Sequence, residues 1–385
     1  MDKVVIVMPA WNEADNIKEM IRVLTGEEFP KIDADMQLLI VDNHSQDGTD
    51  KIVEEASKTH KNIYIIQQDQ PGLGWAYVRG MRYAMNELHA DAILEMDADF
   101  QHPPRFIKPM IDAYLGGAEY AIGSRYIKGG SVPEEWALSR KAVSFFGNLF
   151  IRMVLLNFKV HDLTTGFRLS KVRGVLDQID LEHLMELNRF AYKVDLLYQC
   201  LKNSKKTVEV PLEFAARTKE VSKFNPKEMI STFKVAIILG IKDKIKFIKF
   251  GTVGFLGFVV NFAALRFFRG QGFSETLAWA FSTELAIINN YTLNNIWTFK
   301  ASEIKGLGNT LRKFFQFNLT SAGAIVIQSI LGPLGVKLVG VQYDAFVLIT
   351  IILFVVMPYN YTMYNLFIWK NWKLPFGKKN FLDSK

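Results

Sequence analysis

Short apolar runs and polar turns alternate along the first 222 residues of the chain. Continuous apolar runs at 4–8, 38–41 and 63–66, and the apolar run 92–94 within a fourth strand at 92–96, predict four strands that are covered on both faces. Between them, apolar residues recur at helical spacing, as in Ile17, Met20, Ile21 and Leu24. This alternation of strand and helix predicts an α/β domain in which a parallel sheet has helices on both faces.

The pattern changes after Phe247, where long apolar stretches carry few charges. The stretches 250–268, 273–297, 314–339 and 345–369 are each long enough to cross a bilayer, which takes about 20 residues. They contain a repeat, because "NYTLNNIWTFK" from Asn290 returns as "NYTMYNLFIWK" from Asn360, and "KFIKFG" from Lys246 returns as "KFFQFN" from Lys313. We therefore expect an all-α domain of four membrane helices, built from two hairpin repeats.

A helix is predicted over 225–241, between these two parts, with Met229, Ile230, Phe233 and Ile237 on one face. Such an amphipathic helix is typical of a segment lying in the membrane interface. The expected organisation is a soluble domain at 1–222, interfacial helices at 223–246, the four-helix domain at 247–372 and a basic tail at 373–385.

Positive charges are concentrated in the segments before the first expected span, between the second and third, and after the fourth. The positive-inside rule then places the soluble domain and both termini in the cytoplasm. Cys200 is the only cysteine, which excludes an intrachain disulfide and agrees with a reducing compartment. The net charge of +7 favours an anionic partner without identifying it. Glu284 falls inside the second span, where we expect it to bond Asn289 or Asn261 or to contact a substrate.

Carboxylates follow two of the predicted strands. Asp42 ends the second strand, and Asp97 and Asp99 come directly after the fourth. Ligands of such sheets bind beyond the carboxyl ends of the strands, and Mg²⁺ takes oxygen ligands shared with substrate phosphates. The pattern thus indicates a metal-bridged nucleotide diphosphate site, with a solvated turn as the alternative. There is no P-loop motif and no zinc-like cluster, and His102 is expected to be a loop residue.

Six ordered motifs extend this interpretation: "VMPAWNEADNI", "VDNHSQDGT", "QPGLGWAYVRG", "MDADFQHPP", "AIGSRYIKGG" and "LTTGFRLSK". Together they resemble the inverting glycosyltransferases with a GT-A, Rossmann-like fold, and among these the polyprenyl-phosphate branch that includes dolichyl-phosphate mannose synthases. Some members of that branch also carry a four-helix membrane domain, as this chain does.

The resemblance implies a nucleoside pocket lined by Pro9, Trp11, Glu13 and Asp42. It also implies a site for Mg²⁺ or Mn²⁺, whose ligands are Asp97, Asp99 and Gln101. Trp11 and Asn43 depart from the Tyr and Asp common in the family, which leaves the choice of nucleotide open. Other interpretations are a packed aromatic for Trp11, turn formation for Asn43 and Ser45, and tight helix packing for Gly72 and Gly74.

A second group of residues suits an anionic lipid. Arg140, Lys141 and Ser144 lie at the start of an apolar helix at 143–156, where a helix N-terminus and a guanidinium favour a phosphate. In the family, the positions that match Arg125, Arg140, Ser144 and Arg217 hold the acceptor phosphate or the sugar diphosphate. The alternative is that Arg140 and Lys141 only meet anionic headgroups.

The resemblance implies transfer of a hexose, with mannose from GDP-mannose favoured, to a polyprenyl or dolichyl phosphate with inversion. Asp97, Asp99 and Arg125 are the expected catalytic residues, membrane lipids are expected partners, and nucleic acid is not. UDP-glucose or another UDP-sugar is the alternative donor. A processive polysaccharide synthase is disfavoured because its Gln-x-x-Arg-Trp motif is missing. A non-catalytic protein that binds or flips lipid-linked sugars remains a more remote alternative.

Overall fold

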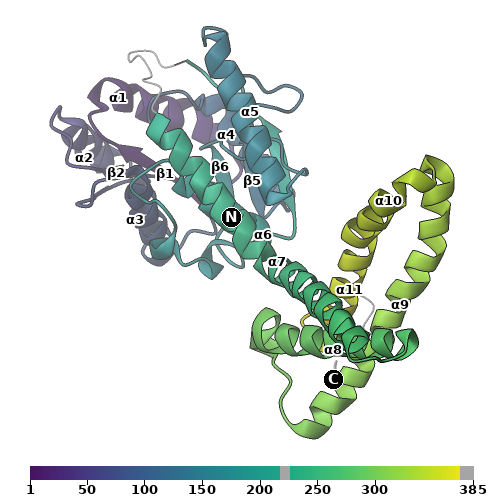
Figure 1. Ribbon diagram of the computed structural model, residues 1–385. Helices are drawn as coiled ribbons and strands as arrows, with labels where there is room; N and C mark the ends of the chain where they lie inside the picture. Colours follow the sequence, from purple (N-terminus) through teal and green to yellow (C-terminus); the bar gives the residue numbers. More distant parts are fainter. Residues whose placement is uncertain (217–225, 373–385) are drawn as a thin grey trace. The chain divides into compact units, whose positions relative to one another are not determined.

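The computed structural model describes residues 1–216 and 226–372 (Figure 1). The chain divides into two compact units, Met1–Ile241 and Lys242–Lys385. The division lies inside the predicted interfacial segment 223–246, because the long helix α7 (Pro226–Gly270) begins in the first unit and continues into the second. The predicted basic tail at 373–385 lies outside the described residues.

A seven-stranded mixed sheet forms the centre of the first unit, in the order β3-β2-β1-β4-β6-β5-β7. The strands are β1 (Lys3–Ala10), β2 (Asp35–Asp42), β3 (Ile63–Gln67), β4 (Ala92–Glu95), β5 (Tyr120–Ser124), β6 (Arg168–Lys171) and β7 (Thr207–Pro211). Neighbouring strands are parallel from β3 to β4 and between β5 and β7, as predicted. The prediction of a parallel sheet is wrong at β6, which runs antiparallel to both β4 and β5. Its sequence, RLSK, has a single apolar residue, so no hydrophobic run marked it as a strand.

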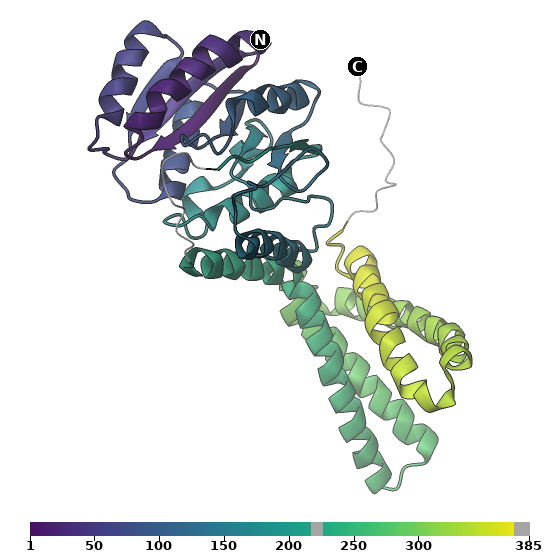
Figure 2. The same ribbon diagram turned by 90° about the horizontal axis from the view of Figure 1, so that it is seen from above.

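Helices cover both faces of this sheet (Figure 2). Along β1, Val4, Ile6 and Met8 pack on one face and Val5 and Val7 on the other, which is the two-residue period of a strand. The first face is covered by α1 (Ala14–Val23), α2 (Thr49–Thr59) and α4 (Ile107–Leu115). The second is covered by α3 (Leu73–Asn86), α5 (Leu138–Leu155) and α6 (Tyr192–Asn203). Burial on both faces explains why the strands read as continuous apolar runs.

The first turns of α7 pack against α5. The rings of Phe150 and Phe233 lie 4.9 Å apart, and a Cβ at Gly240 would come within 2.7 Å of the Val154 carbonyl oxygen. Part of the predicted apolar face of α7 therefore points inward. Large apolar side chains nevertheless remain exposed on the two helices, namely Phe145, Phe146, Met153, Ile230, Ile237 and Ile241. An exposed apolar surface of this kind suits a membrane interface.

The second unit is helical, and its four helical segments, called legs below, overlap the four predicted apolar stretches. After α7 come α8 (Glu275–Leu293), α9 (Leu307–Val339) and a last leg made of α10 (Asp344–Ile351), a π-turn (Ile352–Val356), α11 (Met357–Met363) and a second π-turn (Tyr364–Ile368). Among the residues that the structure describes, two helical segments are long and apolar enough to span a membrane, Lys244–Gly270 and Ile349–Ile368. Glu284 is exposed on α8, and in the described residues no hydrogen bond joins it to Asn289 or Asn261.

The predicted repeat is also present in the backbone. Each repeat ends in a π-turn at the equivalent position, Asn294–Thr298 in the first and Tyr364–Ile368 in the second. Phe299 and Trp369, which occupy equivalent positions, stack with their ring centroids 4.3 Å apart. Asn295 Oδ1 accepts hydrogen bonds from the Ile304 amide at 2.8 Å and from Trp369 Nε1 at 3.0 Å. The two repeats thus meet at a shared aromatic core.

Candidate active site

The two aspartates that follow β4 lie at the carboxyl edge of the sheet, as expected. Asp97 is held from two helices. The Tyr77 hydroxyl of α3 donates to its Oδ1 at 2.7 Å, and Lys193 Nζ of α6 lies 3.6 Å from the same oxygen. The Asp97 side chain is 30% exposed, whereas that of Lys193 is completely buried. Asp97 therefore presents its carboxylate at the surface and is fixed from below.

Lys193 is a buried cation that sequence reasoning missed. Its Nζ makes no hydrogen bond in the described part of the chain and lies 4.6 Å from the centre of the Tyr77 ring. A buried ammonium needs a nearby negative charge to offset its desolvation, and Asp97 supplies one. Lys193 lies 96 residues after Asp97 in the sequence, so only the fold brings the two together.

His102 lies in the same loop, as expected, but its side chain is buried there. Its Nδ1 accepts the Asp97 amide at 3.2 Å, and its ring stacks on Phe167 with centroids 5.3 Å apart. Burial lowers the pKa of His102 to about 4. The imidazole is therefore neutral near pH 7 and orients the backbone of Asp97.

The next residues of the loop supply further oxygen atoms. Asp99 Oδ1 accepts the Gln101 amide at 3.1 Å, and the Gln101 carbonyl accepts the Ala215 amide at 3.0 Å. No three His, Cys, Asp or Glu side chains converge as a metal cluster within residues 1–216 and 226–372. Two carboxylates and one amide nevertheless fit Mg²⁺, which commonly takes one or two protein carboxylates and completes its shell with substrate phosphates and water. The chemistry of Asp97, Asp99 and Gln101 thus fits the expected metal.

The expected nucleoside side is built from the loops after β1 and β2. Buried Asp42 accepts the Ser45 amide at 3.0 Å and the Ser45 hydroxyl at 2.6 Å, and that hydroxyl oxygen accepts the Asn12 amide at 2.9 Å. Ser45 is therefore a turn former, as one interpretation of the sequence held. Trp11 is 64% exposed, which excludes the packed-aromatic interpretation.

Two other residues of the expected pocket lie beside this loop. Pro9 is half-buried near the end of β1. The Glu13 amide donates to Thr49 Oγ1 at 2.9 Å, and Glu13 Oε2 accepts from Asn16 Nδ2 at 2.7 Å. The contacts of Pro9, Trp11, Glu13 and Asp42 with a nucleoside stay predictions.

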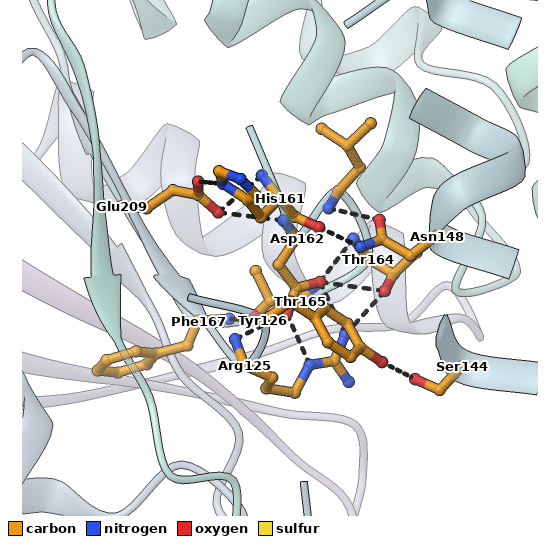
Figure 3. Close-up of polar contacts among 11 residues, drawn as sticks. Arg125, Tyr126, Ser144, Asn148, His161, Asp162, Thr164, Thr165, Phe167 and Glu209 are labelled. Carbon is orange, nitrogen blue, oxygen red and sulfur yellow. Dashed lines mark hydrogen bonds and ion pairs between the residues drawn. The ribbon is translucent and has the colours of Figure 1, made fainter. Parts of the chain in front are cut away.

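Arg125 forms a buried ion pair with Asp162, which the sequence analysis did not single out (Figure 3). Arg125 Nε and Nη2 donate to the two oxygens of Asp162 at 2.7 and 2.8 Å, and the Arg125 amide donates to Oδ2 at 3.1 Å. Burial opposes ionisation of Asp162, but the charge and hydrogen bonds of Arg125 hold its pKa below the ordinary value. The expected contact of Arg125 with a phosphate stays a prediction, and its visible role is to fix the 161–165 loop.

Two more side chains hold that loop. Glu209 of β7 accepts the amides of His161 and Asp162 at 2.9 and 3.1 Å. Asn148 of α5 accepts the Leu163 amide at 2.9 Å and donates to the His161 carbonyl (Figure 3). The loop is thereby tied to β5, β7 and α5. The adjacent motif "LTTGFRLSK" was recognised in the sequence, but Asp162 lies one residue before it.

Arg140 and Ser144 lie in the first turns of α5, as predicted. The guanidinium of Arg140 lies 3.7 Å from the centre of the Trp136 ring, and the Ser144 hydroxyl lies 2.5 Å from that of Tyr126. Trp136 contacts Phe214 edge-on, and Phe214 contacts His102 in the same way. This aromatic chain connects the Asp97 loop to the start of α5. Arg217, the remaining expected ligand, lies outside the described residues.

A second buried pair of opposite charge lies behind the site. Glu95 and Arg168 face each other directly across β4 and β6, and both are buried. Burial raises the pKa of Glu95, although Arg168 and Lys193 oppose the shift. Arg168 Nη1 also donates to the Lys193 carbonyl at 2.5 Å, which anchors the first turn of α6. No pattern in the sequence indicated this pair, because it depends on the antiparallel register of β6.

Comparisons with known proteins match both units. The model of glycosyl transferase family 2 matches residues 5–176, and that of the GtrA/DPMS transmembrane domain matches residues 249–369. The first match runs from β1 to β6 and includes the Asp97–Gln101 loop and the Arg125–Asp162 pair, whereas β7 lies outside it, and the second match covers most of the two helical repeats.

Three curated relatives are similar over most of their length. A dolichol-phosphate mannosyltransferase of Pyrococcus furiosus is 32% identical over 338 residues, which is 84% of this chain and 88% of the relative. A polyprenol monophosphomannose synthase of Mycolicibacterium smegmatis is 31% identical over 61% of this chain and 86% of the relative. An undecaprenyl-phosphate mannosyltransferase of Micrococcus luteus is 30% identical over 58% of this chain and 88% of the relative.

Proposed function

Because the chain belongs to glycosyl transferase family 2, in the polyprenyl-phosphate branch with a GtrA/DPMS transmembrane domain, we propose that it transfers mannose from GDP-mannose to a polyprenyl phosphate. The chain is a glycosyltransferase and a membrane protein. The observation that carries the proposal is the Asp97–Gln101 loop at the carboxyl edge of the sheet, in a chain whose relatives are named mannosyltransferases.

In the proposed reaction, an oxygen of the acceptor phosphate attacks the anomeric carbon of the sugar. The bond from that carbon to the nucleotide diphosphate breaks on the opposite face, so the configuration inverts. A phosphate monoester has a second pKa of about 6, so the attacking oxygen is already anionic near pH 7. A general base is therefore not required. His102 is not needed for that role, since its pKa is about 4 and its Nδ1 already accepts the Asp97 amide.

Asp97, Asp99 and Gln101 would hold Mg²⁺ or Mn²⁺, which neutralises charge on a leaving diphosphate when it is bound. Tyr77 and Lys193 keep the Asp97 carboxylate in one orientation. Such preorganisation matters because a site with fixed charges does not have to reorganise during the reaction.

The acceptor side is proposed at the start of α5, where Arg140 and Ser144 lie among exposed apolar residues such as Phe145 and Phe146. A lipid phosphate could meet the cation while its chain contacts the apolar surface. Arg125 would contribute through the loop that it holds with Asp162, and Arg217 would add a further cation.

We further propose four membrane spans, with the catalytic domain and both termini in the cytoplasm, from the distribution of Lys and Arg between the apolar stretches.

The test is sugar transfer by the full chain in detergent or nanodiscs. Labelled GDP-mannose, UDP-glucose and UDP-N-acetylglucosamine are each supplied with undecaprenyl or dolichyl phosphate, with Mg²⁺ or with EDTA. We expect metal-dependent mannosyl lipid from GDP-mannose, with a β-linked sugar from the α-linked donor. A UDP-sugar as the working donor would keep the mechanism and refute the proposed donor. No lipid product from any donor would favour a protein that binds or flips lipid-linked sugars.

A further inference from the structure

Three cations of the second unit line one cavity of about 510 Å³ at one end of the helical bundle. Arg312 and Lys313 come from the beginning of α9, and Lys370 follows the last helical leg. No carboxylate is among the residues that line this cavity in the described part of the chain. The positive charges therefore have no acidic partner within the cavity.

The rest of the cavity is mostly apolar. Leu319 contributes from α9, and Met363, Leu366 and Phe367 contribute from the last leg. From Arg312 to Thr320, which also lines the cavity, α9 rises by about 12 Å at 1.5 Å per residue. Cations at one end and apolar side chains further along the helices fit a ligand with an anionic head and a hydrocarbon chain.

Lys313 joins the two sides of the cavity. Its Nζ donates to the Phe367 carbonyl at 2.8 Å, so the ammonium is held between α9 and the last leg. Partial burial and the nearby charges of Lys370 and Arg312 lower the pKa of Lys313, which precedes the expected span at 314–339. A bound anion would relieve this repulsion between like charges.

Lys370 adds a separate observation. Its backbone has φ of 50°, in the left-handed region where glycine is the usual residue after a helix. A lysine here has an unfavourable backbone conformation, yet it brings a cation to the cavity.

The internal repeat explains why the second repeat has room for a ligand. In the first repeat, the positions equivalent to Gln316 and Phe367 are Lys249 and Trp297, and Lys249 Nζ lies 5.4 Å from the centre of the Trp297 ring. The second repeat has smaller side chains at both positions. It also has Arg312 where the first has Ile245. The second repeat thus has more space at two positions, and one of its three cations stands at Arg312, whereas the first repeat has a cation at Lys249 instead.

We propose that this cavity binds a lipid phosphate monoester of the polyprenyl phosphate class, in a site built entirely from the GtrA/DPMS unit. A phosphate monoester carries a charge of about −1.5 to −2 at pH 7, whereas the phosphodiester of a bilayer phospholipid carries a single negative charge. Three cations without a carboxylate match the more highly charged headgroup. The choice of a prenyl chain rests on the proposed function, in which such a lipid is the acceptor.

The experiment is protection of Lys313 from an amine-reactive reagent, read by mass spectrometry on the full chain in phosphatidylcholine nanodiscs. The added lipid is undecaprenyl phosphate or, in a second arm, phosphatidylglycerol. With undecaprenyl phosphate at ten times its dissociation constant, we expect modification of Lys313 to slow about tenfold, because only that fraction of sites stays empty. Phosphatidylglycerol at the same concentration should protect much less.

Matched variants make the test specific. The double variant Arg312→Gln/Lys370→Gln should bind about tenfold or more weakly, so that at the same lipid concentration modification of Lys313 slows only about twofold or less. The double variant Lys246→Gln/Lys300→Gln removes the same charge in the first repeat and should retain the protection. Equal protection by phosphatidylglycerol would overturn the assignment to a monoester, and no protection by either lipid would overturn the site. The rate of Lys313 modification is measured without a sugar donor and without turnover, so the result can be interpreted even if no mannosyl transfer is found.

Discussion

Arg125 and Asp162 form a two-pronged ion pair whose side chains are only 8% and 0% exposed. The pair joins the end of β5 to the loop before β6, and Glu209 and Asn148 hold the same loop from β7 and α5. Asp162 also accepts the amides of Thr164 and Thr165 at 3.2 and 3.1 Å. The cation that we expected to meet a phosphate is therefore first an anchor for the chain that borders the site.

Asp162→Asn should destabilise the first unit strongly. It leaves the Arg125 charge buried without its partner, and breaking a buried pair in this way costs roughly 3–5 kcal/mol. Because Cys200 is the only cysteine and is buried in this unit, its modification by a thiol reagent during heating of the full chain reports the unfolding midpoint.

Arg105→Gln is the control for that experiment. Arg105 and Glu213 also form an ion pair, at 2.7 Å, but both side chains are more than half exposed. Loss of this exposed ion pair should change the free energy of unfolding by no more than about 1 kcal/mol. Equal midpoints for Asp162→Asn and Arg105→Gln would show that the buried pair is not the anchor described here.

Cys200 itself should be almost inert in the native protein. Burial raises the pKa of its thiol to about 12, against an ordinary value near 9. The reactive thiolate is therefore scarce at pH 8, and the rate of alkylation should rise about tenfold per pH unit up to pH 11. Because the folded pKa is the higher one, the contribution of Cys200 to stability is present below pH 9 and is lost as the pH rises towards 12. Rapid alkylation of the native chain at pH 8 would contradict this burial.

Lys193→Met should impair sugar transfer, although it substitutes none of the expected metal ligands. The change removes the cation that lies 3.6 Å from Asp97, so the carboxylate loses one of the groups that orient it. Loss of a residue that orients a ligand typically costs 10–100-fold in activity, and we expect a fall of that size in kcat, measured as mannosyl lipid formed at saturating substrates. Lys202→Met, on the exposed side of the same helix, should keep the wild-type rate. Similar transfer rates for both variants would show that Lys193 does not orient Asp97 for the reaction.

Trp11→Ala should weaken donor binding rather than the fold. Its side chain is 64% exposed, so truncation should change the stability by less than about 0.5 kcal/mol. Stacking of a base on an aromatic ring is worth about 1–3 kcal/mol, so the dissociation constant for GDP should rise about tenfold, whereas Trp11→Phe should keep most of the affinity. Calorimetric titration with GDP and UDP measures both the effect and the base preference. An unchanged dissociation constant for GDP in Trp11→Ala would show that the nucleotide base does not stack on Trp11.

The hydrophobic pattern predicted what is local in this fold. The runs that became β1, β2, β3 and β4 were visible because both faces of these strands are buried, and the position of Asp97 followed from the end of β4. The helical legs and the repeat were equally visible, since length and spacing are properties of continuous sequence.

What the pattern could not predict depends on contacts between distant segments. Lys193 meets Asp97 only after α6 has packed against the sheet, and Glu95 faces Arg168 only because β6 runs antiparallel to β4. A lysine on the first turn of a helix looks the same in sequence whether it is buried or exposed. The sequence therefore did not indicate Lys193, Glu95 and Arg168, whereas it did indicate the carboxylates that follow β4.

The central claim is metal-assisted transfer of mannose to a polyprenyl phosphate at the Asp97–Gln101 loop. The most direct measurement compares mannosyl lipid formed from GDP-mannose and undecaprenyl phosphate by the wild-type chain and by Asp99→Ala, over a titration with Mg²⁺ up to saturation. We predict that the wild-type rate rises with Mg²⁺ and that Asp99→Ala stays nearly inactive at every concentration, with Cys200 still protected as evidence of a folded first unit. Full transfer by Asp99→Ala at saturating Mg²⁺ would contradict the account.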